Sequence, residues 1–411
     1  MKTLVIVGAG AAGVFCATRL KGVGGLRVVV LESTSKPLQK LLLTGGGRCN
    51  FTNMNVDKNN PLDFYSRGGR NLRKPFRAFG ATATRDYFQS LGVESKEEDF
   101  GRVFPTSDDA HTIADALMQN THCEFIFNAR AESVSKSNDD TWSVAYRHAD
   151  VQKTIQADFV LFALGGSWQA ELKESLERLS HNFEVPTPAL FSFKTAEAGN
   201  ADWSSMAGLS VQKVILSSEI CGEKFSAEGA MLITKFGVGG PAVLKLSSFA
   251  ARKSAECEHK FELKVNWTGQ TNPEVFRSLI NNTRKSDAKK LIKTRPLFSI
   301  PRTLWEYLTS SIKIAEKTWA NFSKADEKLL ENTLCNYPIA VIGKSPHKEE
   351  FVTCGGVARE CINFADCQSR LSQNIFFAGE CIDIDAITGG FNLQAAWTTA
   401  YLVAEKIKTL V

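Results

Sequence analysis

Short apolar runs alternate with amphipathic segments in the first third of the chain. Leu4–Val7 and Val28–Leu31 are rich in β-branched residues, which is typical of strands buried in a parallel sheet. The segment between them, Ala11–Leu20, has a helical pattern, and Phe159–Leu164 is a further apolar run that ends in two glycines. This order of strands and helices predicts an α/β domain with a parallel sheet.

The pattern changes in the middle of the chain. Between Phe191 and about Phe261, alternating segments such as Val211–Leu216 are separated by Gly and Ser, which favours antiparallel strands. From Pro273 to about Tyr337 the pattern is helical, with many Lys, Glu, Leu and Trp residues. The middle of the chain therefore predicts a β-rich insertion that is followed by a helical insertion.

The C-terminal part returns to strand and glycine signals. These lie at Phe351–Val357 and Ile375–Ala378, and a last helix is predicted from about Leu393. We therefore predict an α/β fold with one discontinuous domain and two inserted domains. The expected ranges are 1–189 with 345–411 for the α/β domain, 190–265 with 338–344 for the β-rich domain, and 266–337 for the helical domain.

The first apolar run leads directly into a dinucleotide-binding pattern. Gly8–Gly13 reads G-x-G-x-x-G after a predicted strand and at the start of a predicted helix. Gly8 permits the tight turn, the missing side chain at Gly10 lets a pyrophosphate approach the backbone, and Gly13 allows close packing of helix on sheet. The helix N-terminus then presents free N–H groups and a partial positive charge to the diphosphate.

Glu32 ends the second predicted strand. A carboxylate at this point accepts hydrogen bonds from the adenosine ribose and repels a 2′-phosphate, which disfavours NADP here. Glycine turns alone are common, and the alternative is a glycine turn with an unrelated surface Glu. The full succession of strand, glycines, helix, second strand and acid favours the dinucleotide site.

Three later features favour FAD over NAD. Thr44–Asn50 (TGGGRCN) follows the second strand; Gly46 and its neighbours allow close approach to a ligand, and Arg48 can meet a phosphate or a carbonyl. Phe376–Glu380 is a strand that ends in Gly and an acid. The turn around Gly389 feeds a helix whose N-terminus can stabilise negative charge on a reduced flavin. A long cofactor that both ends of the chain contact is better matched by FAD.

These motifs resemble a known group, the YhiN-like flavoproteins, also called the BaiN/RdsA family of NAD(P)/FAD-dependent oxidoreductases. The matching motifs run along nearly the whole chain: Gly8–Gly13 with Glu32, Thr44–Asn53, Phe236–Pro241, Val352–Val357 and Phe377–Gln394. The resemblance implies non-covalent FAD in a Rossmann-like domain. It also implies that a β-rich, barrel-like domain and a small helical domain interrupt that domain.

The resemblance further implies which residues contact FAD. Gly10, Ala11 and Ala12 would contact the pyrophosphate, and Glu32 the ribose. The other implied contacts are Lys40, Gly47 and Arg48 along the cofactor, Ala131 at the adenine through its backbone, Gly379 and Glu380 at the ribitol, and Gly390, Asn392 and Leu393 at the isoalloxazine.

The chain departs from the family pattern in one motif. Where relatives commonly have Thr-His-Phe-Gly, this chain has Lys235 in place of the His, and it has Gly239 where Ser is common before Gly-Pro. If that His is an acid or base in relatives, Lys235 or water must replace it, although a surface base is the favoured interpretation of Lys235. No catalytic residue is assigned.

Cysteines and acids suggest no metal or redox site. The ten cysteines include no C-x-x-C pair, which counts against zinc, iron–sulfur and thioredoxin-like sites, and most are expected to be reduced thiols. Cys49 and Cys381 lie inside cofactor motifs and are interpreted as small thiols that pack there. Asp383 and Asp385 follow Glu380 closely, but strand geometry should turn one of them away, so no metal is predicted.

Composition and net charge limit the kinds of partner that this protein is expected to bind. The 411 residues are 43% hydrophobic and carry a net charge of +5, which suits a globular protein of two or three domains and implies neither a nucleic acid nor a membrane partner. No apolar run approaches the roughly 18 residues of a membrane span, and the first is too short for a signal peptide, so a cytoplasmic location is expected. The basic stretch Arg284–Lys293 is interpreted as a solvated face. A small-molecule substrate is expected, and the oligomeric state stays open.

The leading hypothesis is an FAD-dependent oxidoreductase that moves hydride through flavin N5 to or from a small organic substrate. Reduction of an enone-type double bond is one activity that the resemblance implies. Gly237–Pro241 lacks the spacing of a second dinucleotide motif, so NADH or NADPH would bind transiently against the flavin. The alternatives are an FAD-dependent oxidase of a small amine or ketone, an FAD-dependent RNA-modifying protein, and a non-catalytic electron carrier.

Overall fold

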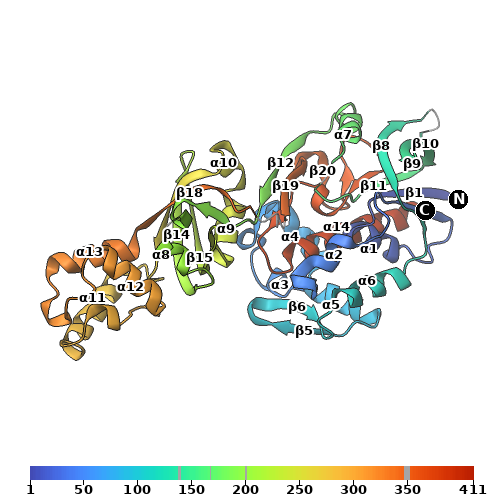
Figure 1. The fold of residues 1–411 in the computed structure, drawn as a ribbon. Helices are drawn as coiled ribbons and strands as arrows, with labels where there is room; N and C mark the ends of the chain where they lie inside the picture. The colour runs from blue at the N-terminus through green and yellow to red at the C-terminus, as the bar shows by residue number, and fades with distance from the viewer. Residues whose placement is uncertain (138–139, 167, 200, 347–351) are drawn as a thin grey trace. The chain divides into compact units, whose positions relative to one another are not determined.

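The computed structural model describes residues 1–137, 140–166, 168–199, 201–346 and 352–411. The chain forms two compact units, which Figure 1 shows in one ribbon. Unit 1 comprises Met1–Pro186 and Val352–Val411, and unit 2 comprises Thr187–Phe351. Among the described residues, no helix is both long enough and apolar enough to cross a membrane.

A seven-stranded sheet forms the centre of unit 1, in the order β20-β21-β22-β11-β1-β2-β7. The strands from β22 to β7 are parallel, and β20 and β21 extend one edge in antiparallel pairing. The sheet strands are β1 (Lys2–Val7), β2 (Leu26–Leu31), β7 (Glu124–Ile126), β11 (Phe159–Phe162), β20 (Ile362–Asn363), β21 (Gln368–Ser369) and β22 (Ile375–Phe377).

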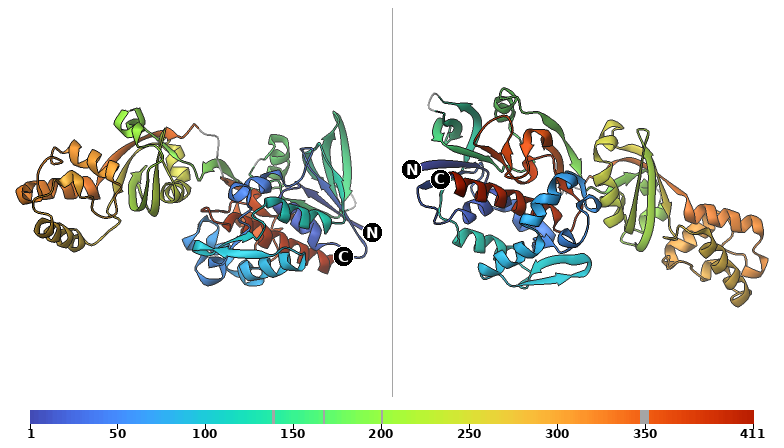
Figure 2. Two further views of the ribbon diagram at one scale, coloured as in Figure 1. Left: turned by 60° about the horizontal axis from the view of Figure 1, so that its bottom comes forward. Right: turned by 180° about the vertical axis from the view of Figure 1, so that it is seen from behind.

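Both faces of this sheet are covered, which explains why its strands are apolar throughout rather than alternating. Leu4 and Ile6 belong to an apolar cluster that includes Trp397 of the C-terminal helix. Val5 belongs to a second cluster that includes Val144 from a small antiparallel sheet. Helices α1 and α14, from the two ends of the chain, lie side by side on one face (Figures 1 and 2).

The remaining elements of unit 1 surround this sheet. Its α-helices are α1 (Ala11–Arg19), α2 (Gln39–Leu43), α3 (Asn55–Lys58), α4 (Gly69–Ala78), α5 (Ala81–Ser90), α6 (Ala110–Gln119), α7 (Ala170–Glu177) and α14 (Phe391–Leu410). Its outer strands are β3 (Thr52–Asn53), β4 (Tyr65–Arg67), β5 (Ser95–Glu98), β6 (Arg102–Pro105), β8 (Ala129–Lys136), β9 (Trp142–His148), β10 (Val151–Ala157), β19 (Val352–Val357) and β23 (Asp385–Ala386). Strand β12 (Phe183–Ala189) begins in unit 1, and its last three residues belong to unit 2.

Unit 2 contains a closed six-stranded barrel in the order β13-β16-β15-β14-β17-β18. Its strands are β13 (Phe193–Thr195), β14 (Ser210–Ile220), β15 (Glu223–Thr234), β16 (Gly237–Gly239), β17 (Lys260–Asn266) and β18 (Tyr337–Lys344). Its helices are α8 (Ala201–Ser205), α9 (Pro241–Phe249), α10 (Ala251–Glu256), α11 (Pro273–Ser286), α12 (Arg302–Ser311) and α13 (Lys324–Cys335). Barrel and helices share one apolar cluster, which includes the buried Trp267 and Trp305.

The predicted fold class is confirmed: a Rossmann-type domain is interrupted by a barrel and helices. Element ends differ by a few residues. The last helix begins at Phe391 rather than Leu393, because Gly390 takes a left-handed conformation that starts the helix earlier. Phe351, the expected start of a strand, lies outside the described residues, and β19 begins at Val352. Cys221 and Cys257 form a disulfide in unit 2, whereas the other eight cysteines are free thiols.

Candidate cofactor site

The first glycine turn joins β1 to α1 and is fixed by close packing. A Cβ at Gly8 would lie 2.6 Å from the Ala163 carbonyl oxygen, and a Cβ at Gly13 would overlap the Gly8 carbonyl oxygen. Side chains are therefore excluded at both positions by the protein itself. This is the tight strand-to-helix turn that the G-x-G-x-x-G pattern predicts.

Gly10 differs from Gly8 and Gly13, because the space beside it is open. A Cβ there would meet only the Ala163 oxygen, at 3.9 Å. Gly10 is the N-cap of α1, no side chain caps this helix, and its first turn, which holds Ala11 and Ala12, contains no acid. An uncapped helix N-terminus beside open space is suited to a diphosphate group.

Glu32 lies next to this turn. One carboxylate oxygen accepts the N–H of Ala9 at 2.8 Å, and the other accepts the N–H and hydroxyl of Thr34 at 2.8 Å. The N–H of Ala129 donates to the Glu32 carbonyl at 2.8 Å. Ala131 follows on β8, buried between this edge and the core. The structure thus brings the expected ribose and adenine residues to the edge where α1 begins.

The TGGGRCN loop follows α2 and contains three successive left-handed residues. Gly45, Gly46 and Gly47 have φ values of 59°, 69° and 87°, which residues with a side chain rarely adopt. A Cβ at Gly45 would lie 2.8 Å from the Asn50 nitrogen, but a Cβ at Gly46 or Gly47 would meet nothing within 4 Å. Gly45 is therefore needed for packing, whereas Gly46 and Gly47 leave the backbone surface open.

The end of this loop and strand β3, which follows it, pack directly on the turn that precedes α14. A Cβ at Gly390 would overlap the Thr52 carbonyl oxygen, and the Asn53 amide donates to the Gly389 carbonyl at 2.8 Å. The side chains of Thr52 and Gln394 are hydrogen-bonded. Motifs from the two ends of the chain therefore form one surface, as a shared cofactor requires.

Two features of this surface match the polar edge of a flavin. Helix α14 has no side-chain cap and no acid in its first turn, so its N-terminal N–H groups favour negative charge. The Asn50 side-chain oxygen is buried beside Gly390 without a hydrogen-bond partner. Buried acceptors in native proteins are normally satisfied, and the isoalloxazine ring carries an N–H donor. The residues present therefore fit FAD.

The residues expected at the ribitol also lie close together. Lys40 and Glu380 form an ion pair at 2.6 Å, and Glu380 also accepts the Thr353 N–H at 3.1 Å. Gly379 lies against α1, where its Cβ would be 3.1 Å from the Cβ of Ala12. Lys40, Glu380 and Gly379 thus lie beside the first turn of α1.

Three predicted residues have other partners in this structure. The Arg48 guanidinium pairs with Glu98 and Asp108 and lies 4.1 Å from the centre of the Phe104 ring. Asn392 donates to the Ala386 carbonyl at 3.0 Å and accepts its N–H at 2.9 Å, so it fixes β23. Leu393 is half-buried against the apolar cluster of α1 and α14.

One buried ion pair was not predicted from the sequence. Arg67 and Asp385 form a bidentate pair in which the Arg67 side chain is 9% exposed and the Asp385 side chain 0%. Asp383 pairs with Arg359 at 3.3 Å and is also fully buried. The reason given for turning one Asp away does not hold, because β23 contains only Asp385–Ala386 and the two acids share no continuous strand; they pair with different arginines.

The cysteines and Lys235 add no reactive group to this surface. Burial raises the pKa of the Cys49 and Cys381 thiols to about 12, so both are neutral at ordinary pH. The Cys381 thiol contacts the carbonyl oxygens of Phe162 and Ala378. Lys235 belongs to unit 2, where it is exposed and lies 5.7 Å from the centre of the Phe236 ring.

The chain is similar to known proteins along nearly its whole length. A profile of the HI0933-like protein Rossmann domain matches residues 2–406. The chain is 27% identical over 412 residues to the ribosomal RNA dihydrouridine synthase of Escherichia coli (strain K12), covering 98% of this chain and 97% of that protein. It is 26% identical over 426 residues to the 3-dehydro-bile acid delta(4,6)-reductase of Clostridium scindens, covering 98% of each.

Among solved structures, one likeness is to the 3-ketosteroid delta1-dehydrogenase from Sterolibacterium denitrificans. The TM-score is 0.52 with 11% sequence identity, and the match covers 100% of both chains. At that identity, the likeness concerns the fold alone.

Proposed function

The chain belongs to the HI0933-like Rossmann family, and on that premise we propose that it is an FAD-dependent reductase of a carbon–carbon double bond conjugated with a carbonyl group. Membership confirms the resemblance to the YhiN-like flavoproteins. The observation that carries the proposal is the single surface made by the α1 turn, the TGGGRCN loop and the turn before α14. Bound FAD would supply hydride transfer at N5.

Residues of unit 1 would bind and orient the cofactor. Gly10 and the first turn of α1 would take the diphosphate, and Glu32 the ribose. The open backbone at Gly46 and Gly47 would lie along the cofactor. The N-terminus of α14 would hold negative charge at the pyrimidine edge of the ring.

The substrate class follows from what two relatives have in common. One is named a ribosomal RNA dihydrouridine synthase and the other a 3-dehydro-bile acid delta(4,6)-reductase. Both names describe saturation of a double bond conjugated with a carbonyl group, although one substrate is a nucleic acid and the other a steroid. The shared chemistry supports a conjugated carbonyl as the hydride acceptor for this chain.

The electron donor is proposed to be NADH or NADPH, bound transiently at the flavin. The first step of the test is anaerobic reduction of the FAD-loaded protein by each nucleotide in turn. The second step is reoxidation by a cyclic enone and by uridine-containing RNA, with a saturated ketone as the matched control. Reoxidation by either conjugated carbonyl, but not by the saturated ketone, is the expected result.

Other outcomes identify other functions. Rapid oxygen consumption with a small amine or ketone, without a nicotinamide, would replace the proposal with an oxidase. Bound FAD that is reduced but reoxidised by no small molecule or RNA would replace it with an electron carrier.

A further inference from the structure

Helix α4 presents a continuous stripe of positive charge. Arg70, Arg73, Lys74 and Arg77 follow the spacing i, i+3, i+4, i+7, which places all four on one face of a helix. All four are exposed, whereas Leu72 and Phe76 on the opposite face are buried. From Arg70 to Arg77 the stripe is about 10 Å long at 1.5 Å per residue.

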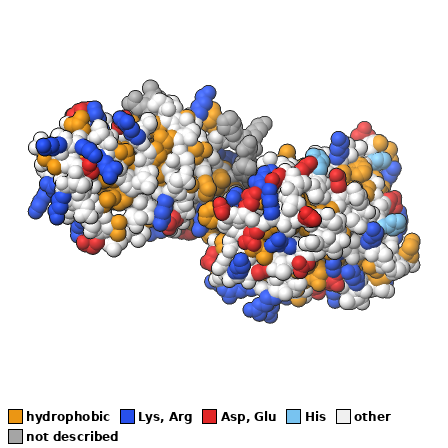
Figure 3. Space-filling view, turned by 90° about the horizontal axis from the view of Figure 1, so that it is seen from below, with side chains coloured by type: hydrophobic (Ala, Val, Ile, Leu, Met, Phe, Trp, Pro, Cys, Tyr) orange, Lys and Arg blue, Asp and Glu red, His pale blue; other side chains and the backbone are white. Residues whose placement is uncertain are grey.

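No carboxylate neutralises this stripe within the part of the chain that the structure describes. The polar contact that Arg73 makes is with the Asn60 side-chain oxygen, at 3.0 Å. Two basic groups at the cofactor surface of unit 1 are paired, in contrast: Lys40 with Glu380, and Arg48 with Glu98 and Asp108. The basic stretch of unit 2 is partly paired, through Lys290 with Asp287 and Lys293 with Glu316. On the face shown in Figure 3, basic and acidic side chains are mixed.

Three features of the stripe oppose or favour α4 to different degrees. Like charges three and four residues apart repel each other, and Arg70 in the first turn, without any acid there, opposes the helix dipole, whereas Arg77 in the last turn is favourable. Helix α4 buries its apolar face regardless of these charges. The stability of α4 therefore does not explain why four basic residues lie on one face, whereas binding of an anionic ligand would explain it.

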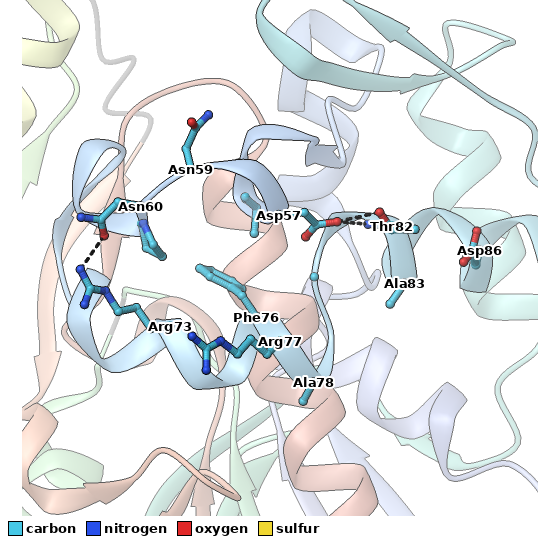
Figure 4. A pocket seen from close by; sticks show the side chains of 13 residues that line it. Asp57, Asn59, Asn60, Arg73, Phe76, Arg77, Ala78, Thr82, Ala83 and Asp86 are labelled. Atoms are coloured by element: carbon cyan, nitrogen blue, oxygen red, sulfur yellow. Dashed lines mark hydrogen bonds between the residues drawn. The ribbon is translucent and has the colours of Figure 1, made fainter.

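A hollow of about 750 Å³ adjoins the stripe. Figure 4 shows Arg73 and Arg77 on one side of it, with Asn59 and Asn60 on the loop above. Asp57 also lines it, but its carboxylate caps α5 by accepting the N–H groups of Ala81 and Thr82 at 2.8 Å. Asp86 is the other acid on the wall. The Asn59 amide donates to Asn55, and the Asn60 oxygen accepts from Leu62 and Arg73. The hollow therefore offers exposed guanidinium groups, the Asn59 oxygen and the Asn60 amide N–H groups, which suit phosphates and base edges.

The stripe connects to the cofactor surface through packed aromatic rings. Phe76, on the buried face of α4, lies 5.4 Å from the ring of Tyr65. The Tyr65 hydroxyl donates to the carbonyl of Phe391, the first residue of α14, at 2.6 Å. Helix α4 thus directly supports the element whose N-terminus is proposed to contact the flavin.

We infer that the α4 stripe and the adjoining hollow bind the phosphate backbone of a single-stranded nucleic acid. Four cations over about 10 Å face more than one phosphate, and the open hollow leaves room for a nucleotide that Asn59 and Asn60 can contact. This inference rests on the proposed function, since it makes a base of the strand the carrier of the conjugated carbonyl. In the sequence analysis, the net charge of +5 did not imply a nucleic-acid partner. That value is the sum over all 411 residues, whereas the four positive charges of the stripe lie close together.

The test uses the full FAD-loaded chain and a fluorescently labelled single-stranded oligouridylate, with anisotropy measured over a range of KCl concentrations. The variant R73Q/R77Q removes two charges of the stripe. The matched control K285Q/K289Q removes two exposed charges from unit 2. The stripe variant should bind more weakly and lower the slope of log affinity against log salt by about 1.4, given about 0.7 per phosphate. The control should retain the wild-type affinity and slope.

Three results would overturn the inference. One is wild-type binding by R73Q/R77Q, and another is an equal loss in the control. The third is a variant R73Q/R77Q that still binds RNA but no longer binds NADPH. That result would show that the stripe binds a dinucleotide instead of RNA. The FAD content of every sample is measured, because it distinguishes a failure of this inference from a failure of the proposed function. Normal FAD and reducibility without RNA binding would refute this inference alone, whereas absence of FAD would refute the proposed function.

Discussion

Replacing Gly10 with Ala separates the role of the first glycine turn in binding from its role in folding. The backbone at Gly10 has φ −79° and ψ −171°, a conformation that Ala adopts readily. The added Cβ would meet no protein atom closer than 3.9 Å. The new methyl group therefore projects into the space that the diphosphate is proposed to occupy.

The two effects of this change differ in size. In the apoprotein, an Ala N-cap is worse than Gly by roughly 0.5–1 kcal/mol, and the stiffer unfolded chain offsets about 0.4–1 kcal/mol of this. In the complex, the methyl group displaces a diphosphate from the N–H groups of the turn. Loss of two hydrogen bonds to a charged group, at about 1.5–3 kcal/mol each, weakens binding by about 3–6 kcal/mol.

The assay has two parts. Urea unfolding of the apoprotein should give nearly the same free energy for wild type and Gly10→Ala. Titration with FAD, followed by flavin fluorescence, should show at least a hundredfold weaker binding, which corresponds to about 3 kcal/mol. Gly13→Ala is the matched control, because its Cβ would overlap the Gly8 carbonyl; it should destabilise the apoprotein itself. Wild-type FAD affinity in Gly10→Ala would refute the placement of the diphosphate.

Three further changes test other parts of unit 1. Glu32→Ala should weaken FAD binding by about 1–3 kcal/mol, and unchanged affinity in the same titration would exclude its role at the ribose. Asp385→Ala leaves the Arg67 charge buried without this partner, so urea unfolding should show a loss of about 3–5 kcal/mol, whereas Asp115→Ala, at an exposed position within α6, should have little effect. Burial lowers the pKa of His181 below 6.5; stability should therefore be full above pH 6.5 and fall as the pH drops towards the lowered pKa. His181→Gln should flatten that dependence, and an equally steep loss in the variant would assign it to other groups.

The elements that the sequence predicts well are those whose signal is local. The run Leu4–Val7, the glycine turn and the first helix depend on neighbouring residues, and all three lie where the pattern placed them. Alternation within Val211–Leu216 likewise predicts a strand, because side chains of a strand point alternately to its two faces, and the segment lies in β14 of the barrel.

The missed contacts join residues that are distant in the chain. Arg67 and Asp385 are 318 positions apart, and no local pattern marks them as partners. Arg48 was expected to meet a phosphate or a carbonyl of the cofactor, but Glu98 and Asp108 reach it from 50 and 60 positions away. The sequence alone cannot decide which anion an arginine meets, because that depends on how the loops pack.

The flavin content of the protein as isolated tests the central claim most directly. The account predicts a yellow protein that releases about one equivalent of intact FAD on denaturation, since both ends of the chain form a single non-covalent site. A colourless protein that takes up no FAD when the cofactor is added to the folded chain would contradict it.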